Sequence, residues 1–326
     1  MEQLLQRLVT DLPGGAQMIQ LAALGTHAKN YTINGGTNTA SGTGDITQLP
    51  LNNKNFHFNF GTLAKEYDGS ADVAYTDRQN KYHAATEFIN EHYVDMDGDG
   101  QYTAGTDVLL GGASASGLNV TSATYADKDA GQNKSVTYLV SLGNLNNYDL
   151  SGLTSVTSGN ATLSYANGTL TAKTTGSITP RMVYASLKNP TPVTKVYDGG
   201  TAILQNNQPQ NIMRDVHLDG LLTGTANDDG VRLDTSAARA EYADKNVGQS
   251  KNVIYHVALT GTGAGTNYQV VDASGSDLPK DARGAYLTGS GTGTITKAPL
   301  TIDFAPVNKT YEIGRASCRE RVSSPV

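Results

Sequence analysis

The densest group of chemically active side chains lies in residues 95–107, where three aspartates occupy alternate positions and a glycine follows. Oxygen ligands at this spacing can surround a hard cation, as they do in protein calcium-binding loops. The predicted ligands are Asp95, Asp97, Asp99, the backbone carbonyl of Gln101, and Asp107. The usual bidentate glutamate is missing because Thr106 stands in its place, and no helix is expected to follow. The pattern predicts a structural Ca2+ that stiffens an inserted loop, with a plain solvated Asp-Gly turn as the alternative.

Other residues that could do chemistry are scattered along the chain. His83 and His92 flank a short segment, 84–89, that is a candidate helix, and both are expected at the surface. His256 is expected to be half-exposed on a strand. The glycine-rich stretches 261–265 and 289–293 lack the Gly-Lys-Ser/Thr sequence of a phosphate-binding loop, so they are predicted to be hairpin turns. We therefore expect no enzymatic activity.

The composition indicates an all-β protein that binds neither nucleic acid nor membrane. The chain has 36 Gly, no Trp, and 17 Tyr against 5 Phe, and this balance favours short strands joined by tight turns. A net charge of −6 argues against a surface for nucleic acid. An apolar run long enough to insert into a membrane is missing from the sequence. Residues 1–312 contain no cysteine, which excludes a disulfide framework there.

The chain repeats itself at a fixed offset. The segment Tyr-Ala-Asp-Lys that begins at Tyr125 returns at Tyr242, and each copy leads into alternating apolar residues. The first copy has Val136, Tyr138, Val140 and Leu142, and the second has Val253, Tyr255, Val257 and Leu259. Alternation of this kind is typical of a strand with one buried face. The two copies therefore predict two equivalent strands in two repeated modules.

Three further markers recur in the same order. Tyr-Asp-Gly occurs at 67–69 and 197–199, and Tyr311 begins a third copy. Asn-Tyr occurs at 30–31, 147–148 and 267–268, and Gly-x-Ile-Thr contains Ile46, Ile178 and Ile295. Glycine after Tyr-Asp suits a tight turn because it reaches positive φ without strain. Tyr197 is expected to bury its ring and to give its hydroxyl a partner near the module edge.

These markers predict five segments. Residues 1–60 are the C-terminal part of a truncated repeat, 61–190 a full repeat with an inserted acidic loop, and 191–304 a second full repeat. Residues 305–312 are the start of a truncated repeat. Residues 313–326 resemble the translation of a sequencing adapter and are interpreted as a non-native tail. We therefore expect any signal peptide to lie outside this sequence.

The order of the markers resembles the YDG/MBG repeats of filamentous-haemagglutinin-like bacterial surface adhesins. The resemblance rests on Lys-x-Tyr-Asp-Gly at 65–69 and 195–199, Tyr-Ala-Asp-Lys-Asn-x-Gly at 242–248, and Ile-Thr-x-x-Pro at 295–299. It covers residues 1–311 and departs from the pattern in an insertion near residues 80–108. The resemblance implies an exported protein on the bacterial cell surface that reaches ligands on host or neighbouring cells.

We expect small β-sandwich modules, Ig-like or β-grasp-like, arranged as an elongated rod that acts as the non-catalytic stalk of an adhesin. Two alternatives stay open. The modules could themselves bind glycans or host matrix through exposed tyrosine and asparagine, or they could be the spacer of a large extracellular enzyme.

Overall fold

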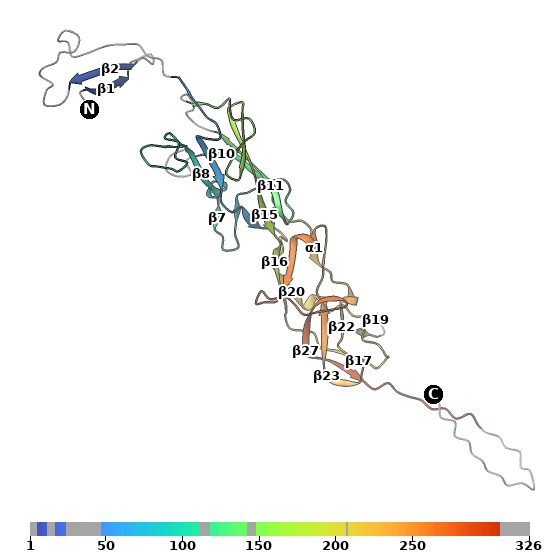
Figure 1. Cartoon of the computed structure of the whole chain (residues 1–326). Coiled ribbons are helices and arrows are strands. Elements are labelled where there is room, and N and C mark those ends of the chain that lie inside the picture. Colours follow the sequence, from blue (N-terminus) through green and yellow to red (C-terminus); the bar gives the residue numbers. More distant parts are fainter. Residues whose placement is uncertain are drawn as a thin grey trace, which may run out of the picture. The chain divides into compact units, whose positions relative to one another are not determined.

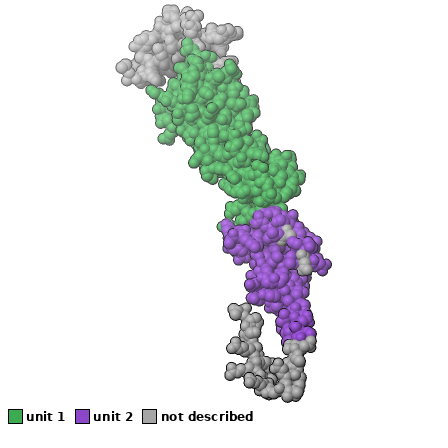
Figure 2. Space-filling view, turned by 90° about the vertical axis from the view of Figure 1, so that its right-hand side faces the viewer, with its two compact units in different colours: residues 1–185, 218–233, 259–277 green, residues 186–217, 234–258, 278–326 purple. Residues whose placement is uncertain are grey.

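The computed structural model describes residues 5–11, 17–23, 47–110, 118–141, 148–206 and 208–306. The predicted all-β class is confirmed, since nearly all regular elements are strands (Figure 1). The chain divides into two compact units, each assembled from three separate stretches (Figure 2). Unit 1 contains residues 1–185, 218–233 and 259–277, and unit 2 contains residues 186–217, 234–258 and 278–326. Unit 1 therefore includes two stretches of the second sequence repeat.

Some predictions concern residues outside this description. They are the markers Asn30-Tyr31, Ile46, Asn147 and Tyr311, the apolar residue Leu142, and the tail at 313–326. The predicted segment boundaries stay predictions. In the part of the chain that the structure describes, no helix combines the length and apolar character needed to cross a bilayer.

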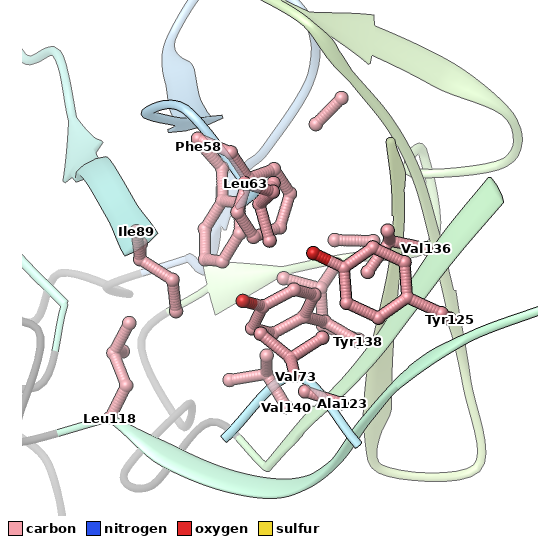
Figure 3. Packing of buried hydrophobic residues seen from close by; sticks show 14 of the residues in the cluster. Phe58, Leu63, Val73, Ile89, Leu118, Ala123, Tyr125, Val136, Tyr138 and Val140 are labelled. Atoms are coloured by element: carbon pink, nitrogen blue, oxygen red, sulfur yellow. The ribbon is translucent and has the colours of Figure 1, made fainter. Parts of the chain in front are cut away.

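The largest sheet of unit 1 is six-stranded, in the order β10-β11-β15-β14-β13, with β5 paired in parallel to the end of β15. Its strands are β5 (Ala64–Glu66), β10 (Asn119–Tyr125), β11 (Gly131–Ser141), β13 (Val156–Ser158), β14 (Ala161–Ala166) and β15 (Thr169–Thr179). Val136, Tyr138 and Val140 of β11 are buried and point into the core (Figure 3). The alternation predicted for this strand is confirmed, because every second residue faces the core.

A three-stranded sheet packs into the same core and carries the inserted loop. It consists of β4 (Phe56–Phe60), β8 (Ile89–Val94) and β9 (Val108–Leu109). Phe56 and Phe58 of β4 are fully buried, and Phe60 contacts Tyr138 with ring centroids 4.5 Å apart. The candidate helix at 84–89 is confirmed as a 3-10 helix, η3 (Ala85–Phe88), which leads directly into β8.

Short strands complete the description of this part. Paired strands are β1 (Leu5–Asp11) with β2 (Gln17–Ala23), β3 (Leu49–Pro50) with β12 (Tyr148–Asp149), β6 (Tyr75–Thr76) with β7 (Tyr82–His83), and β21 (Arg232–Leu233) with β24 (Leu259–Thr260). A further sheet has the order β20 (Val216–Asp219), β16 (Arg181–Leu187), β25 (Tyr268–Val271). A short helix, α1 (Ala264–Asn267), precedes β25.

Unit 2 contains a five-stranded sheet in the order β17-β27-β23-β22, with β26 paired to the start of β27. The strands are β17 (Val193–Val196), β22 (Ala240–Tyr242), β23 (Gly248–His256), β26 (Lys280–Asp281) and β27 (Gly284–Thr296). The unit also has β18 (Leu204–Gln205), β19 (Gln208–Pro209), and two 3-10 helices, η5 (Met213–Asp215) and η6 (Ala237–Arg239).

The two large sheets share one four-stranded arrangement. β10, β11, β15 and β5 in unit 1 correspond to β22, β23, β27 and β17 in unit 2, and in both sheets the last pair is parallel. Val253 and Tyr255 of β23 are fully buried, as Val136 and Tyr138 are in β11. The sequence repeat is therefore a repeat of the fold.

Two histidine predictions are wrong. His256 is 1% exposed, because Glu241 lies 3.3 Å from its Nε2 and Tyr286 packs against its ring. His92 is also buried, in the middle strand of the β4-β8-β9 sheet. Strand alternation identifies the main buried face but does not show which elements cover the other face.

The two glycine-rich predictions also need correction. Residues 261–263 form a turn, but residues 264–267 form helix α1. Residues 289–293 lie inside strand β27, not in a hairpin turn. Here the glycines make room for tyrosine rings, because an added Cβ would approach the ring of Tyr255 to 3.0 Å at Gly289 and that of Tyr242 to 2.7 Å at Gly293.

Candidate functional site

The acidic loop is the connection of a β-hairpin in unit 1. Val94 of β8 pairs with Val108 of β9. Asp95, which follows β8, and Asp107, which precedes β9, therefore lie at the same end of the hairpin. Both carboxylates are nearly buried, at 4% and 8% exposure, whereas Asp97 and Asp99 are exposed. The loop leads into strand β9, and not into a helix.

Backbone N–H groups of the loop hold the two buried carboxylates. Asp95 accepts hydrogen bonds from the N–H of Gly98 (2.7 Å) and of Gly100 (2.9 Å). Asp107 accepts from the N–H of Met96 (2.8 Å) and of Thr103 (2.6 Å). Gly98 and Gly100 have φ of +80° and +77°, a conformation that bends the loop around the carboxylates.

The structure brings four of the five predicted ligands together. Asp95, Asp97, Asp99 and Asp107 each offer an oxygen, and these atoms all lie within 4.8 Å of one another. Gln101 lies in the same loop, where its N–H donates to Asp99 Oδ1 (2.7 Å). The role of its carbonyl stays a prediction.

Electrostatics differ between the members of the cluster. Burial alone would raise the pKa of Asp95, but the N–H groups of Gly100 and Gly98 and nearby His57 hold that pKa below its usual value. The Asp99 N–H lowers the pKa of Asp97, yet desolvation and the negative charges of Asp99, Asp107 and Asp95 outweigh it, so that the pKa is raised. A bound cation would relieve this repulsion between like charges.

The Lys-x-Tyr-Asp-Gly segments form the same turn in each unit. The ammonium groups of Lys65 and Lys195 are buried, and each donates to three oxygens of its own turn. For Lys65 the acceptors are Asp68 Oδ1 (2.8 Å), Ser70 O (2.9 Å) and Asp72 O (2.7 Å). For Lys195 they are Asp198 Oδ1 (2.7 Å), Gly200 O (2.7 Å) and Ala202 O (3.1 Å). A buried ammonium needs such partners, so the lysine fixes the turn.

The remaining markers support these turns. Gly69 and Gly199 have φ of +80° and +81°, which confirms the prediction that the turn requires glycine. Tyr125 donates to Ser177 O (3.3 Å), and its counterpart Tyr242 donates to Thr294 O (3.2 Å). The glycine of Gly-x-Ile-Thr lies under this tyrosine ring in both units, since a Cβ at Gly176 would come within 3.0 Å of the Tyr125 ring.

In unit 1 the first Tyr-Asp-Gly turn is covered by residues of the second repeat. Tyr67 is 1% exposed and packs edge-on against Tyr268, with ring centroids 5.5 Å apart. Asp229 accepts hydrogen bonds from both hydroxyls, at 3.1 Å from Tyr67 and 2.7 Å from Tyr268. Burial, followed by the charge of Asp229, raises the pKa of Tyr67 to about 12. We call this set of contacts the repeat junction.

Two asparagines extend the repeat junction. Asn267 accepts from the N–H of Ala130 (2.8 Å) and donates to Asp129 (2.8 Å). Asn227 donates to the carbonyl of Asp68 (3.0 Å). The Asn-Tyr marker of one repeat therefore binds the Tyr-Asp-Gly and Tyr-Ala-Asp markers of the repeat before it.

The sequence markers include Tyr67, Asp68, Asn267 and Tyr268 of the repeat junction, but they do not predict the contacts of these residues. Asp229 and Asn227 belong to an Asn-Asp-Asp-Gly stretch that is too sparse to predict a site. Their partners, Tyr67 and Asp68, lie about 160 positions earlier in the chain. The usable signal is the fixed order of the markers, and the structure gives the pair Asn267-Tyr268 a role in the repeat junction.

Neither the curated proteins nor the solved structures contain a match to this chain. One domain family does match, over a region that includes the second Tyr-Asp-Gly turn, Asp229, Asn267 and Tyr268. Residues 179–275 are a YDG domain.

Proposed function

We propose that this chain consists of non-catalytic structural repeats from the stalk of an exported bacterial cell-surface adhesin. The observation that carries the proposal is the repeat junction, where the turn of one repeat is sealed by buried contacts with the next. A protein that must extend a binding region away from a cell needs modules that join in series. Ligands on host or neighbouring cells would then be bound by other parts of the parent protein.

The proposal includes small β-sandwich modules, Ig-like or β-grasp-like, in an elongated rod. Two observations support it: the strand arrangement that recurs in units 1 and 2, and the marker turns that recur with it. Small-angle X-ray scattering of residues 47–306 tests the rod directly. We expect a pair-distance distribution with a long tail, as for modules placed end to end. A compact, near-spherical distribution would contradict the stalk.

We also propose that the acidic loop binds Ca2+ through Asp95, Asp97, Asp99 and Asp107, with the Gln101 carbonyl as a fifth ligand. The carboxylates fit the ion, since Ca2+ favours clusters of oxygen ligands and four such groups are close together here. The bound ion would balance their charge and stiffen the β8-β9 hairpin. In that case the loop has a structural role in the stalk.

Calorimetric titration of the metal-free chain with CaCl2 tests the site. We expect one bound ion per chain, and Asp95→Asn or Asp107→Asn should weaken the affinity at least about tenfold because each removes a charged ligand. Asp149→Asn is a matched control, since Asp149 accepts from the Ser151 N–H in a turn of the same unit, outside the cluster. Absence of binding heat, together with unchanged stability in CaCl2, would identify a plain Asp-Gly turn.

A further inference from the structure

The second Tyr-Asp-Gly turn is built like the first, but none of the residues that the structure describes covers it. Tyr197 is 40% exposed whereas its counterpart Tyr67 is 1% exposed. An added Cβ at Gly69 would lie 2.7 Å from the carbonyl oxygen of Asn227, but at Gly199 it would meet nothing within 4 Å. The turn itself is the same, because Lys195 holds Asp198 as Lys65 holds Asp68. The difference therefore lies in what covers each turn.

The neighbouring marker shows the same contrast. Ala130, whose N–H donates to Asn267, is half-buried against the core of unit 1. Its counterpart Val247 is 45% exposed. Asn246 occupies the position of Asp129, whose carboxylate accepts a hydrogen bond from the Asn267 amide. An asparagine side-chain oxygen can accept the same hydrogen bond. Val247 offers more apolar surface than the alanine it replaces.

The second Tyr-Asp-Gly turn borders a hollow in unit 2. A cavity of about 430 Å3 is lined by residues of the turn, by Leu204 and by the end of strand β27. Val196, beside Tyr197, is 53% exposed. We call the surface formed by Val196, Tyr197, Asp198, Gly199 and Val247 the open turn face.

We propose that the open turn face is a docking surface for a further YDG-type repeat. The occupant would bring an Asn-Tyr pair and an acidic residue, which would bind Val247 and Tyr197 as Asn267, Tyr268 and Asp229 bind Ala130 and Tyr67. The repeat junction of unit 1 is an interface of this kind that is already present in the chain. The docking proposal rests on the repeat structure and not on the cell-surface location, so the docking proposal and the cell-surface proposal can fail independently.

A tandem chain tests the docking. Residues 180–306 are appended directly after Thr296, which reproduces the order Thr179-Pro180 of the first junction. Val247→Cys is the probe, and Cys318→Ser removes the one cysteine of the 326-residue chain used for comparison. The rate of modification by a maleimide-polyethylene glycol reagent is then measured by gel shift.

We expect Val247→Cys to react at least about tenfold more slowly in the tandem chain than in the 326-residue chain. Replacing the Asn-Tyr pair of the appended copy by alanines should restore the rate. Ala130→Cys is the matched control, and it should react slowly in both chains because its junction is already formed. The control also reports any loss of folding in unit 1.

Three results would overturn the proposal. One is an equal rate for Val247→Cys in both chains while the appended copy resists protease. Another is an appended copy that stays unfolded, because a docked repeat must be folded. The third is slow reaction in the 326-residue chain, which would show that this chain covers the open turn face itself.

Discussion

Truncating the two equivalent turn tyrosines should affect stability very differently. Tyr67→Ala removes a ring that is 1% exposed, its edge-on contact with Tyr268, and its hydrogen bond to Asp229. Tyr197→Ala removes a ring that is 40% exposed at the same position of the same turn. The pair is matched in residue type, turn geometry and neighbouring lysine. Any difference between the two variants therefore measures the repeat junction.

Removal of a buried aromatic side chain costs about 3–5 kcal/mol of the free energy of unfolding. Tyr67→Ala should fall in this range, whereas Tyr197→Ala should cost ~1 kcal/mol or less, as expected for a half-exposed side chain without a buried partner. With an m-value in urea of about 1–3 kcal/mol/M, the midpoint for unit 1 should fall by more than about 1 M in Tyr67→Ala. Tyrosine circular dichroism and pulse proteolysis can follow the transitions.

Tyr67→Phe separates the hydroxyl from the ring. It keeps the packing and loses one hydrogen bond to a carboxylate, so the expected cost is about 1.5 kcal/mol, well below that of Tyr67→Ala. Equal losses for Tyr67→Ala and Tyr197→Ala would refute the reasoning, because the covering of the first turn would then contribute nothing.

Three other predictions follow from single contacts. Gly293→Ala should destabilise unit 2 by about 1–3 kcal/mol in urea unfolding, because its Cβ would lie 2.7 Å from the Tyr242 ring. Gly265→Ala, with open space around it, should be neutral. Equal effects of the two substitutions would contradict the role given to the strand glycines. Burial raises the pKa of Tyr67 and Tyr242 from 10.0 to about 12, so the folded state holds these protons more tightly. The resulting stabilisation of the folded state is present below pH 10 and should be lost between pH 10 and about 12. Titration of the tyrosinate absorbance, measured alongside unfolding, checks this loss. Tyrosines that all ionise near pH 10 in the folded chain would contradict the prediction. Removal of Ca2+ with a chelator should increase proteolytic cleavage within residues 95–107. Asp107→Asn should show the increased cleavage both with and without Ca2+. Equal cleavage of both chains, with and without Ca2+, would exclude a stiffening role of the ion.

Several features of the fold could be predicted from the sequence because they depend on local rules. Alternation identified the buried face of β11 and β23, since strand side chains point to opposite faces in turn. Glycine after Tyr-Asp identified the turns at Gly69 and Gly199, since both need positive φ. The spacing of aspartates identified the carboxylate cluster, because a hairpin loop of this length keeps its own residues close together.

Other features depend on contacts between distant residues and could not be predicted. Tyr197 was expected to bury its ring, but that burial needs a covering segment, which only Tyr67 has in the described part of the chain. The burial of His256 depends on Glu241 and Tyr286, and its own strand gives no sign of them. The glycines at 289–293 were predicted to form a turn because the tyrosine rings that pack against them come from two other strands, β22 and β23.

Accessibility on intact cells tests the central claim most directly. Antibodies raised against residues 179–275 are applied to whole and to permeabilised cells that produce the protein, with and without external protease. We predict that whole and permeabilised cells are labelled equally, and that external protease treatment removes the labelling. Labelling that appears only after permeabilisation and survives external protease would contradict a cell-surface stalk.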